Sequence, residues 1–252
     1  MRRRYAMALL MILGMAALTY GADDFWVKKD WKTWSKAECK KMLEESPWAK
    51  RIVVDNNSIA SSLPLATGHL GDNPGFGMTS PGAGDITYFV QLLSAEPVRE
   101  AFIRQEQIEQ KFDKMSGAEK SAFDASVEKQ LSFIKGDMIA IRIVFEASKP
   151  ALGDAVKEYW QNLPPGTDPA RTYLVTEKGI KIPPFTFSFM QGSETTIELT
   201  FPRSVRTETV IAPDAKSVKL QFPNPAIGEF PERTVTVEYS LDKMAWNGKL
   251  AY

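Results

Sequence analysis

Three tryptophans near the start of the chain, Trp31, Trp34 and Trp48, are the residues best suited to hold a ligand. Tryptophan rings form platforms for sugars and anchors for peptides, and they are enriched at interaction hot spots. The alternative is structural, because aromatic burial contributes strongly to small cores and the same rings could clamp a short helix onto a sheet. The sequence favours this structural interpretation and keeps the ligand platform as the alternative.

The histidine and the cysteine offer little nucleophilic chemistry. His69 is the only imidazole and Cys39 the only thiol, and no Gly-x-Ser-x-Gly elbow is present to supply a strained serine. Cys39 falls on the apolar face of an expected helix, where it suits a small buried hydrophobe. A single Cys and a single His exclude an internal disulfide and a His/Cys-rich metal site. We therefore predict no catalytic residue of this kind, no metal site and no cofactor.

Paired carboxylates, the groups that hydrolyse glycosides, are defined by their separation in three dimensions. The sequence alone therefore cannot select them. Asp85, Glu146 and Glu158 are candidates only in the sense that any acidic residue is. A secreted hydrolase with such a pair stays open as an alternative function.

The charge balance and the glycine pattern argue against nucleic-acid and nucleotide binding. Lys plus Arg number 31 and Asp plus Glu number 31, so the chain has no bulk electrostatic attraction to nucleic acid. The Gly-rich stretch 56–84 contains no Gly-Lys-Ser/Thr, and a strand follows it where a phosphate site needs a helix N-terminus. We interpret this stretch as a long loop that holds His69.

The N-terminus has the layout of a secretory signal peptide. Arginines at 2–4 precede an uncharged run over 6–18 that ends in small residues, which predicts a signal peptide over 1–21. A cut after Ala22, or an uncleaved anchor over 5–22, is the alternative. Removing the signal leaves 28 basic and 31 acidic residues. We expect an exported protein, periplasmic or extracellular, that touches a membrane only through the signal segment if it stays uncleaved.

The N-terminal part of the mature chain mixes helices and strands. Ser35 and Glu38 have the spacing of a capping box, which predicts a short amphipathic helix over 36–45. Helix starts after Ser94 and Ser116 predict an αα-hairpin inserted between strands. The other expected elements are strands over 51–55, 86–93 and 138–147 and a helix over 151–162.

From residue 171 the chain is nearly all β. Runs such as 218–222 alternate apolar and polar residues, as antiparallel strands with one buried face do, and Asn247 and Gly248 are a hairpin turn signal. We predict an α+β protein with an antiparallel, β-rich, sandwich-like C-terminal half, an αα-hairpin insertion and a short N-terminal helix. The expected organisation is a single domain over 22–252, with a mixed part over 22–165 and a mainly β part over 166–252.

Three stretches of the mature chain form a combination of motifs that recurs in other proteins. They are 29–39 running on to Leu43 and 46–48, then 94–101, and then 243–244, 247–249 and Tyr252. With these, the chain resembles a family of uncharacterised exported proteins of acidobacterial-type soil bacteria. It departs from the family where Phe89-Val-Gln-Leu-Leu replaces Val-Arg-Trp. The matched residues are helix caps, proline stops and a turn, so the resemblance implies no activity and no catalytic residue.

These observations lead to one expected function and two alternatives. We expect an exported, non-enzymatic envelope protein that acts by binding a protein partner or a small ligand, and no nucleic acid. The first alternative is the secreted hydrolase with paired carboxylates. The second is a carbohydrate-binding module built on Trp31, Trp34 and Trp48.

Overall fold

The computed structural model describes residues 24–56, 84–132, 134, 136–163, 171–191, 195–228 and 230–252. The expected signal segment and His69 lie outside these residues, as does nearly all of the Gly-rich stretch. Within the described part, no helix is both long enough and apolar enough to cross a membrane.

The larger of the two main β-sheets has five antiparallel strands. Their order across the sheet is β1-β2-β3-β7-β6. The strands are β1 (Ala49–Asp55), β2 (Asp85–Leu92), β3 (Met138–Ala147), β6 (Thr186–Gln191) and β7 (Thr195–Pro202). The expected strand over 138–147 is confirmed residue for residue, with its isoleucines at alternate positions and buried.

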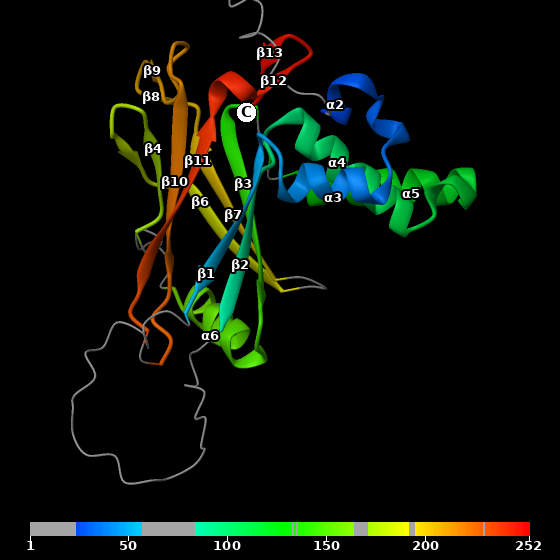
Figure 1. The fold of residues 1–252 in the computed structure, drawn as a ribbon. Coiled ribbons are helices and arrows are strands. Elements are labelled where there is room, and N and C mark those ends of the chain that lie inside the picture. Colours follow the sequence, from blue (N-terminus) through cyan, green and yellow to red (C-terminus); the bar gives the residue numbers. More distant parts are fainter. Residues whose placement is uncertain are drawn as a thin grey trace, which may run out of the picture.

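A second antiparallel sheet packs face to face with the first (Figure 1). Its order is β11-β10-β4-β5. The strands are β4 (Tyr173–Thr176), β5 (Lys181–Ile182), β10 (Ser217–Asn224) and β11 (Arg233–Ser240). The predicted α+β, antiparallel β-rich class is therefore confirmed. The sandwich, however, is not confined to the C-terminal half, because β6 and β7 pair onto the sheet begun by β1, β2 and β3.

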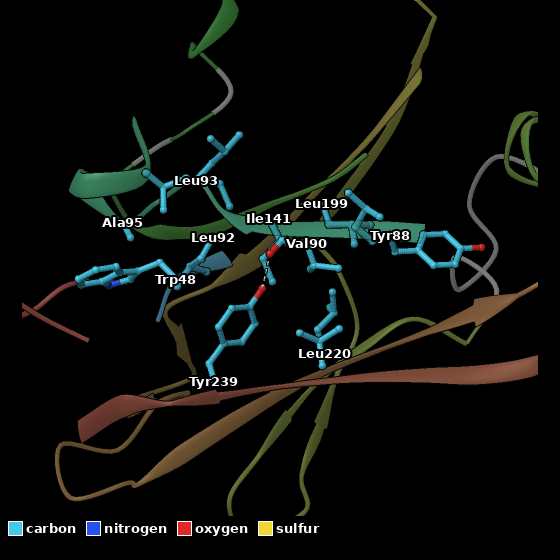
Figure 2. Packing of buried hydrophobic residues seen from close by; sticks show 14 of the residues in the cluster. Trp48, Tyr88, Val90, Leu92, Leu93, Ala95, Ile141, Leu199, Leu220 and Tyr239 are labelled. Atoms are coloured by element: carbon cyan, nitrogen blue, oxygen red, sulfur yellow. Dashed lines mark hydrogen bonds between the residues drawn. The ribbon is translucent and has the colours of Figure 1, made fainter. Parts of the chain in front are cut away.

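The core between the sheets is apolar and is crossed by two tyrosine hydrogen bonds. Tyr239 Oη on β11 donates to the carbonyl oxygen of Val90 on β2 at 3.2 Å, as Figure 2 shows. Tyr88 Oη donates to Asn224 Oδ1 at 2.8 Å. Because both phenols are buried, these bonds satisfy polar groups that would otherwise destabilise the fold. They also fix the position of one sheet against the other.

Helices pack beside the larger sheet and at one end of the sandwich (Figure 1). α3 (Lys36–Glu44) and α4 (Glu96–Glu109) lie together on the outer face of the larger sheet, with α5 (Gly117–Gln130) continuing the αα-hairpin, and α6 (Pro150–Gln161) lies at the end of the strands away from them. The predicted short N-terminal helix and αα-hairpin are confirmed, and both capping boxes form, at Ser35 with Glu38 and at Ser116 with Glu119. Trp160 on α6 is buried and stacks on Phe187 of β6, with the two ring centroids 5.8 Å apart.

Short elements complete the chain. Their bounds are α2 (Phe25–Lys28), η1 (Trp31–Thr33), η3 (Phe112–Lys114), β8 (Ser204–Val205), β9 (Glu208–Thr209), η4 (Leu241–Lys243), β12 (Ala245–Trp246) and β13 (Lys249–Leu250). The hairpin of β12 and β13 turns at Asn247 and Gly248, with φ angles of 49° and 74°. Both residues adopt the positive φ that a type I′ turn requires, so the predicted hairpin is confirmed.

One buried ion pair joins β3 to β7 on the outer face of the larger sheet. Arg142 Nε and Nη2 both donate to Glu198 Oε1, at 3.2 and 2.9 Å, and both side chains are almost fully buried. The guanidinium also lies 4.8 Å from the ring of Phe102 on α4. The pair therefore sits between the sheet and the helix, which places α4 in a defined register on the strands.

Candidate ligand cleft at the tryptophan cluster

The N-terminal tryptophans pack into one aromatic cluster with Trp246 from the C-terminal hairpin. Trp34 and Trp48 each meet Trp246 edge to face, with ring centroids 6.2 Å apart. Phe25 packs edge-on against Trp34 at 5.2 Å, and Trp26 against Trp48 at 6.2 Å. Edge-to-face pairs at these separations stabilise an aromatic cluster beyond simple burial. The cluster joins the two ends of the chain.

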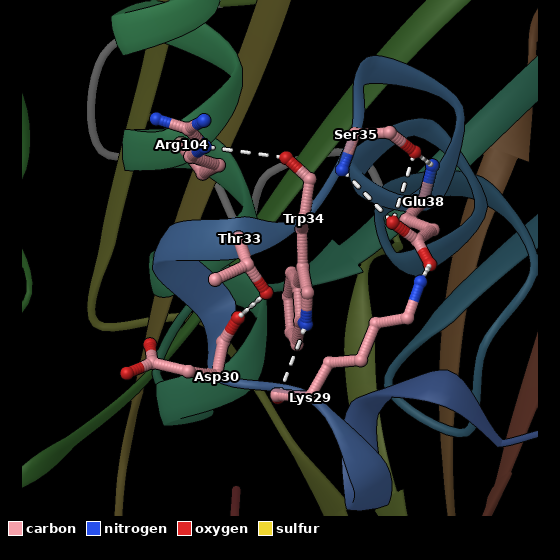
Figure 3. A network of polar contacts seen from close by, with 7 residues as sticks. All are labelled: Lys29, Asp30, Thr33, Trp34, Ser35, Glu38 and Arg104. Atoms are coloured by element: carbon pink, nitrogen blue, oxygen red, sulfur yellow. Dashed lines mark hydrogen bonds and ion pairs between the residues drawn. The ribbon is translucent and has the colours of Figure 1, made fainter. Parts of the chain in front are cut away.

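Trp34 is the centre of the turn that precedes α3 (Figure 3). Its indole Nε1 donates to the carbonyl oxygen of Lys29 at 3.4 Å, and its own carbonyl oxygen accepts from Arg104 Nε on α4 at 3.2 Å. Thr33 Oγ1 donates to the carbonyl oxygen of Asp30 at 2.7 Å in the same turn. These bonds fix the η1 turn that carries Trp31.

Glu38 holds the other side of this turn. Its carboxylate accepts from Lys29 Nζ at 2.5 Å and, within the capping box, from the backbone N–H of Ser35 at 2.9 Å. The Lys29 bond is the largest of several hydrogen bonds that lower the pKa of Glu38. The carboxylate is therefore kept ionised while it closes residues 29–38 into a short loop on the helix N-terminus.

The predicted ligand platform of three tryptophans is wrong for two of them. Trp34 and Trp48 have 0% of their surface exposed, so neither ring presents a face to a ligand. Trp48 is further fixed by its Nε1, which donates to the carbonyl oxygen of Ala251 at 2.8 Å. These two residues do what the structural interpretation expected, and clamp the helix and the hairpin. Trp31 differs, because its ring is partly exposed.

Trp31 lies in a cleft of about 420 Å³, here called the Trp31 cleft. Trp26, Trp246 and Glu100 also line it. Sequence reasoning missed Trp246 and Glu100. Trp246 is separated from the other tryptophans by about two hundred residues, and Glu100 is one acid among many on an amphipathic helix. Only the packing of α4 and the C-terminal hairpin against the η1 turn brings them together.

Trp246 and Glu100, which line the Trp31 cleft, each have a buried polar atom with no hydrogen-bond partner among the described residues. These atoms are the donor Trp246 Nε1 and the acceptor Glu100 Oε2. Buried polar atoms in native proteins are nearly always paired, so each of the two is a candidate contact for a bound molecule. A hydroxyl group can donate to a carboxylate and accept from an indole N–H.

The electrostatics of the cleft centre on Glu100. Burial, followed by the negative charges of Glu96 and Asp30, raises the pKa of Glu100 to about 7. Its carboxyl group is thus divided between the protonated and ionised forms near neutral pH. Lys32, which also lines the cleft, has its Nζ 5.7 Å from the centroid of the Trp31 ring. A strongly shifted carboxyl group in a cleft is a feature often found at functional sites.

The other residues considered from the sequence do not join this cleft. Glu146 and Glu158 are exposed on β3 and α6, and Asp85 begins β2. Cys39 is fully buried on α3, and burial raises the pKa of its thiol to about 11, so it is an unreactive core residue as expected. Within the described ranges, no group of three or more His, Cys, Asp or Glu residues is placed to hold a metal ion.

Comparisons with known proteins supply no activity for this cleft. No family model matches the chain, and no curated protein matches its sequence. The chain is similar to the crystal structure of a DUF4426 family protein from Pseudomonas aeruginosa PAO1, with 12% identity, a TM-score of 0.29, and coverage of 62% of this chain and 86% of that chain. A likeness this weak carries no argument, so the fold assignment rests on the strand pairing of this chain.

Proposed function

We propose that this chain is an exported, non-enzymatic binding protein whose Trp31 cleft takes a hydroxyl-rich ligand, such as an oligosaccharide. One observation carries the proposal: Trp246 and Glu100, whose Nε1 and Oε2 atoms are buried without a partner among the described residues, line the same cleft as the partly exposed Trp31. Sugars combine hydroxyl groups that donate and accept with a C–H face that stacks on tryptophan. Export is supported by the signal-like segment 1–21 and by the resemblance to exported proteins.

The cleft is built to be rigid, which favours binding of a defined ligand. The η1 turn that carries Trp31 is fixed through Trp34 and Glu38, and Trp246 is held edge to face by two buried rings. A preorganised site loses little conformational entropy when the ligand arrives. The two tryptophans that are buried therefore support the third, which faces the ligand.

The test is calorimetric titration of the mature protein with cello-, chito- and xylo-oligosaccharides. We expect binding to one of these classes and a loss of about tenfold or more in affinity for Trp31→Ala, equivalent to about 1.4 kcal/mol. Phe185→Ala is the matched control, because Phe185 is an aromatic residue that is 70% exposed and lies outside the cleft. The proposal fails if the folded protein binds none of the three classes, or if Trp31→Ala binds as well as Phe185→Ala.

One observation favours a second candidate, the hydrolase with paired carboxylates. Glu100 has a pKa of about 7, which suits a general acid, and Asp30 lies close enough for its charge to contribute to that value. A hydrolase would shorten the oligosaccharides, and Glu100→Gln would abolish the cleavage. Chromatography of the titrated sugars after prolonged incubation decides between the two functions.

A further inference from the structure

A second cleft, of about 760 Å³, opens between α4, α5 and the chain that follows β7. Arg99, Arg203 and Ser94 contribute polar groups to it, and we call it the Arg99–Arg203 cleft. Apolar residues of the αα-hairpin, including Ile103 and Leu131, complete the lining. The cleft is separate from the Trp31 cleft, since no residue lines both.

Backbone carbonyl oxygens and an aromatic ring, rather than Asp or Glu side chains, contact the two arginines of this cleft. Arg99 Nη1 donates to the carbonyl oxygens of Ser94, at 2.5 Å, and Leu93, at 3.5 Å. Arg203 Nη2 donates to a main-chain oxygen of Tyr252, and its guanidinium lies 4.6 Å from the Tyr252 ring. Among the described residues, neither arginine forms an ion pair with an Asp or Glu side chain.

The two guanidinium groups also influence each other. Burial lowers the pKa of Arg99, and the positive charge of Arg203 lowers it further. The negative charges of Glu96 and Glu100 act in the opposite direction. Two like charges that share a partly buried cleft repel each other. A bound anion would relieve this repulsion, because it attracts both.

Two hydrogen-bond donors in the cleft lack partners. Ser94 is only 7% exposed, and its Oγ has no hydrogen-bond partner among the described residues. Arg203 Nε is likewise buried and unpaired. A hydroxyl and a guanidinium N–H are donors that bind carboxylate and phosphate oxygens with charge-assisted hydrogen bonds. The unpaired Ser94 hydroxyl is the observation that points to a ligand rather than to a merely basic surface.

We propose that the Arg99–Arg203 cleft binds an amphiphile with one anionic headgroup, a carboxylate or a phosphate, on an aliphatic chain. The headgroup lies between Arg99, Arg203 and the Ser94 hydroxyl, and the chain lies along the apolar wall of the αα-hairpin. Asp124 and Glu128 on α5 also line the cleft. Their negative charge disfavours a ligand with a second anionic group, and confines the headgroup to the arginine side.

The first test uses displacement of a fluorescent fatty acid, 11-(dansylamino)undecanoic acid, from the mature protein. We expect dodecanoate or dodecyl phosphate to displace the probe, and the stronger of the two identifies the headgroup. Dodecanol, which lacks the charge, and inorganic phosphate, which lacks the chain, should displace it poorly. The proposal is overturned if dodecanol competes as well as dodecanoate, or if inorganic phosphate competes as well as dodecyl phosphate.

Variants locate the binding to this cleft. Because Ser94 Oγ has no partner, Ser94→Ala should leave stability unchanged while it weakens probe binding about tenfold, the effect of one hydrogen bond to a charged group. Arg203→Gln should weaken it further, and Ser94→Ala decides the matter if Arg203→Gln does not fold. Arg51→Gln, at an exposed arginine on β1, is the control. Equal binding by Ser94→Ala and Arg51→Gln would overturn the proposal.

Trp31→Ala should bind the probe as the wild type does, because Trp31 does not line this cleft. The two proposed sites can therefore be tested independently.

Discussion

Replacing Glu100 by glutamine should stabilise the protein at alkaline pH and have little effect at acid pH. The pKa of Glu100 is raised from its ordinary 4.5 to about 7, so the folded state holds this proton more tightly than the unfolded state does. Below pH 4.5 both states are protonated and the residue has no effect. Between pH 4.5 and 7 only the unfolded state ionises freely, so stability falls as pH rises, and above pH 7 the full penalty is present.

The size of the effect follows from the same values. A difference of about 2.5 pKa units corresponds to a ceiling of about 3.4 kcal/mol. Glu100 is only partly buried, so solvent screens part of the penalty for its charge. We therefore expect the ionised carboxylate to destabilise the folded state by about 1–2 kcal/mol. Glutamine has nearly the shape of the protonated acid and does not titrate. The free energy of unfolding of Glu100→Gln, relative to that of the wild type, should therefore increase by this amount as the pH rises from 4.5 to 8.

The assay is urea unfolding of wild type and variant at several pH values, followed by tryptophan fluorescence. Glu109→Gln is the control on the same helix, because Glu109 is exposed and its ion pair with Lys36 contributes little. The stability difference for the control should not change with pH. A flat difference for Glu100→Gln, or one that grows toward acid pH, would refute the burial of this carboxyl group and its place in the Trp31 cleft.

Three further substitutions separate structural from binding roles. Trp34→Ala should lower the free energy of unfolding by about 3–5 kcal/mol in urea melts, because it empties a fully buried site, whereas Trp31→Ala should cost much less. Arg142→Met should cost about 3–5 kcal/mol because it leaves Glu198 buried without its partner, and adding Glu198→Leu should restore most of the loss, as thermal denaturation can show. Tyr239→Phe should cost about 1 kcal/mol by chemical denaturation through its lost hydrogen bond between the sheets; no change would mean that this bond contributes nothing.

Much of the local structure could be predicted from the sequence because its causes are local. The two capping boxes begin helices where a serine and a glutamate three residues later predict them. The Asn247 and Gly248 turn forms because only two adjacent residues set its geometry. Strand periodicity likewise shows which side chains face inward, since alternation depends on the backbone alone.

Strand order and the Trp31 cleft depend on contacts between distant residues, and sequence patterns do not report these contacts. Nothing in the alternating residues of β7 says that its neighbour is β3 rather than a strand of the C-terminal half. Glu100 looks like an ordinary solvent-facing acid until α4 is packed against the η1 turn. The sequence could not show which tryptophan rings are buried, because Trp34 and Trp48 pack against Trp246, which lies about two hundred residues further along the chain.

The hydrogen bond from Trp48 to Ala251 joins residues 203 positions apart, and this has a consequence for the order of folding. The cluster around Trp34 and Trp48 cannot close until Trp246 and Ala251 have been synthesised and have reached it. Closing so long a loop is entropically slow, and until then several tryptophans remain open to water and to other chains. During synthesis the early segment would be prone to aggregate, so a chaperone that binds aromatic segments should raise the yield of folded protein.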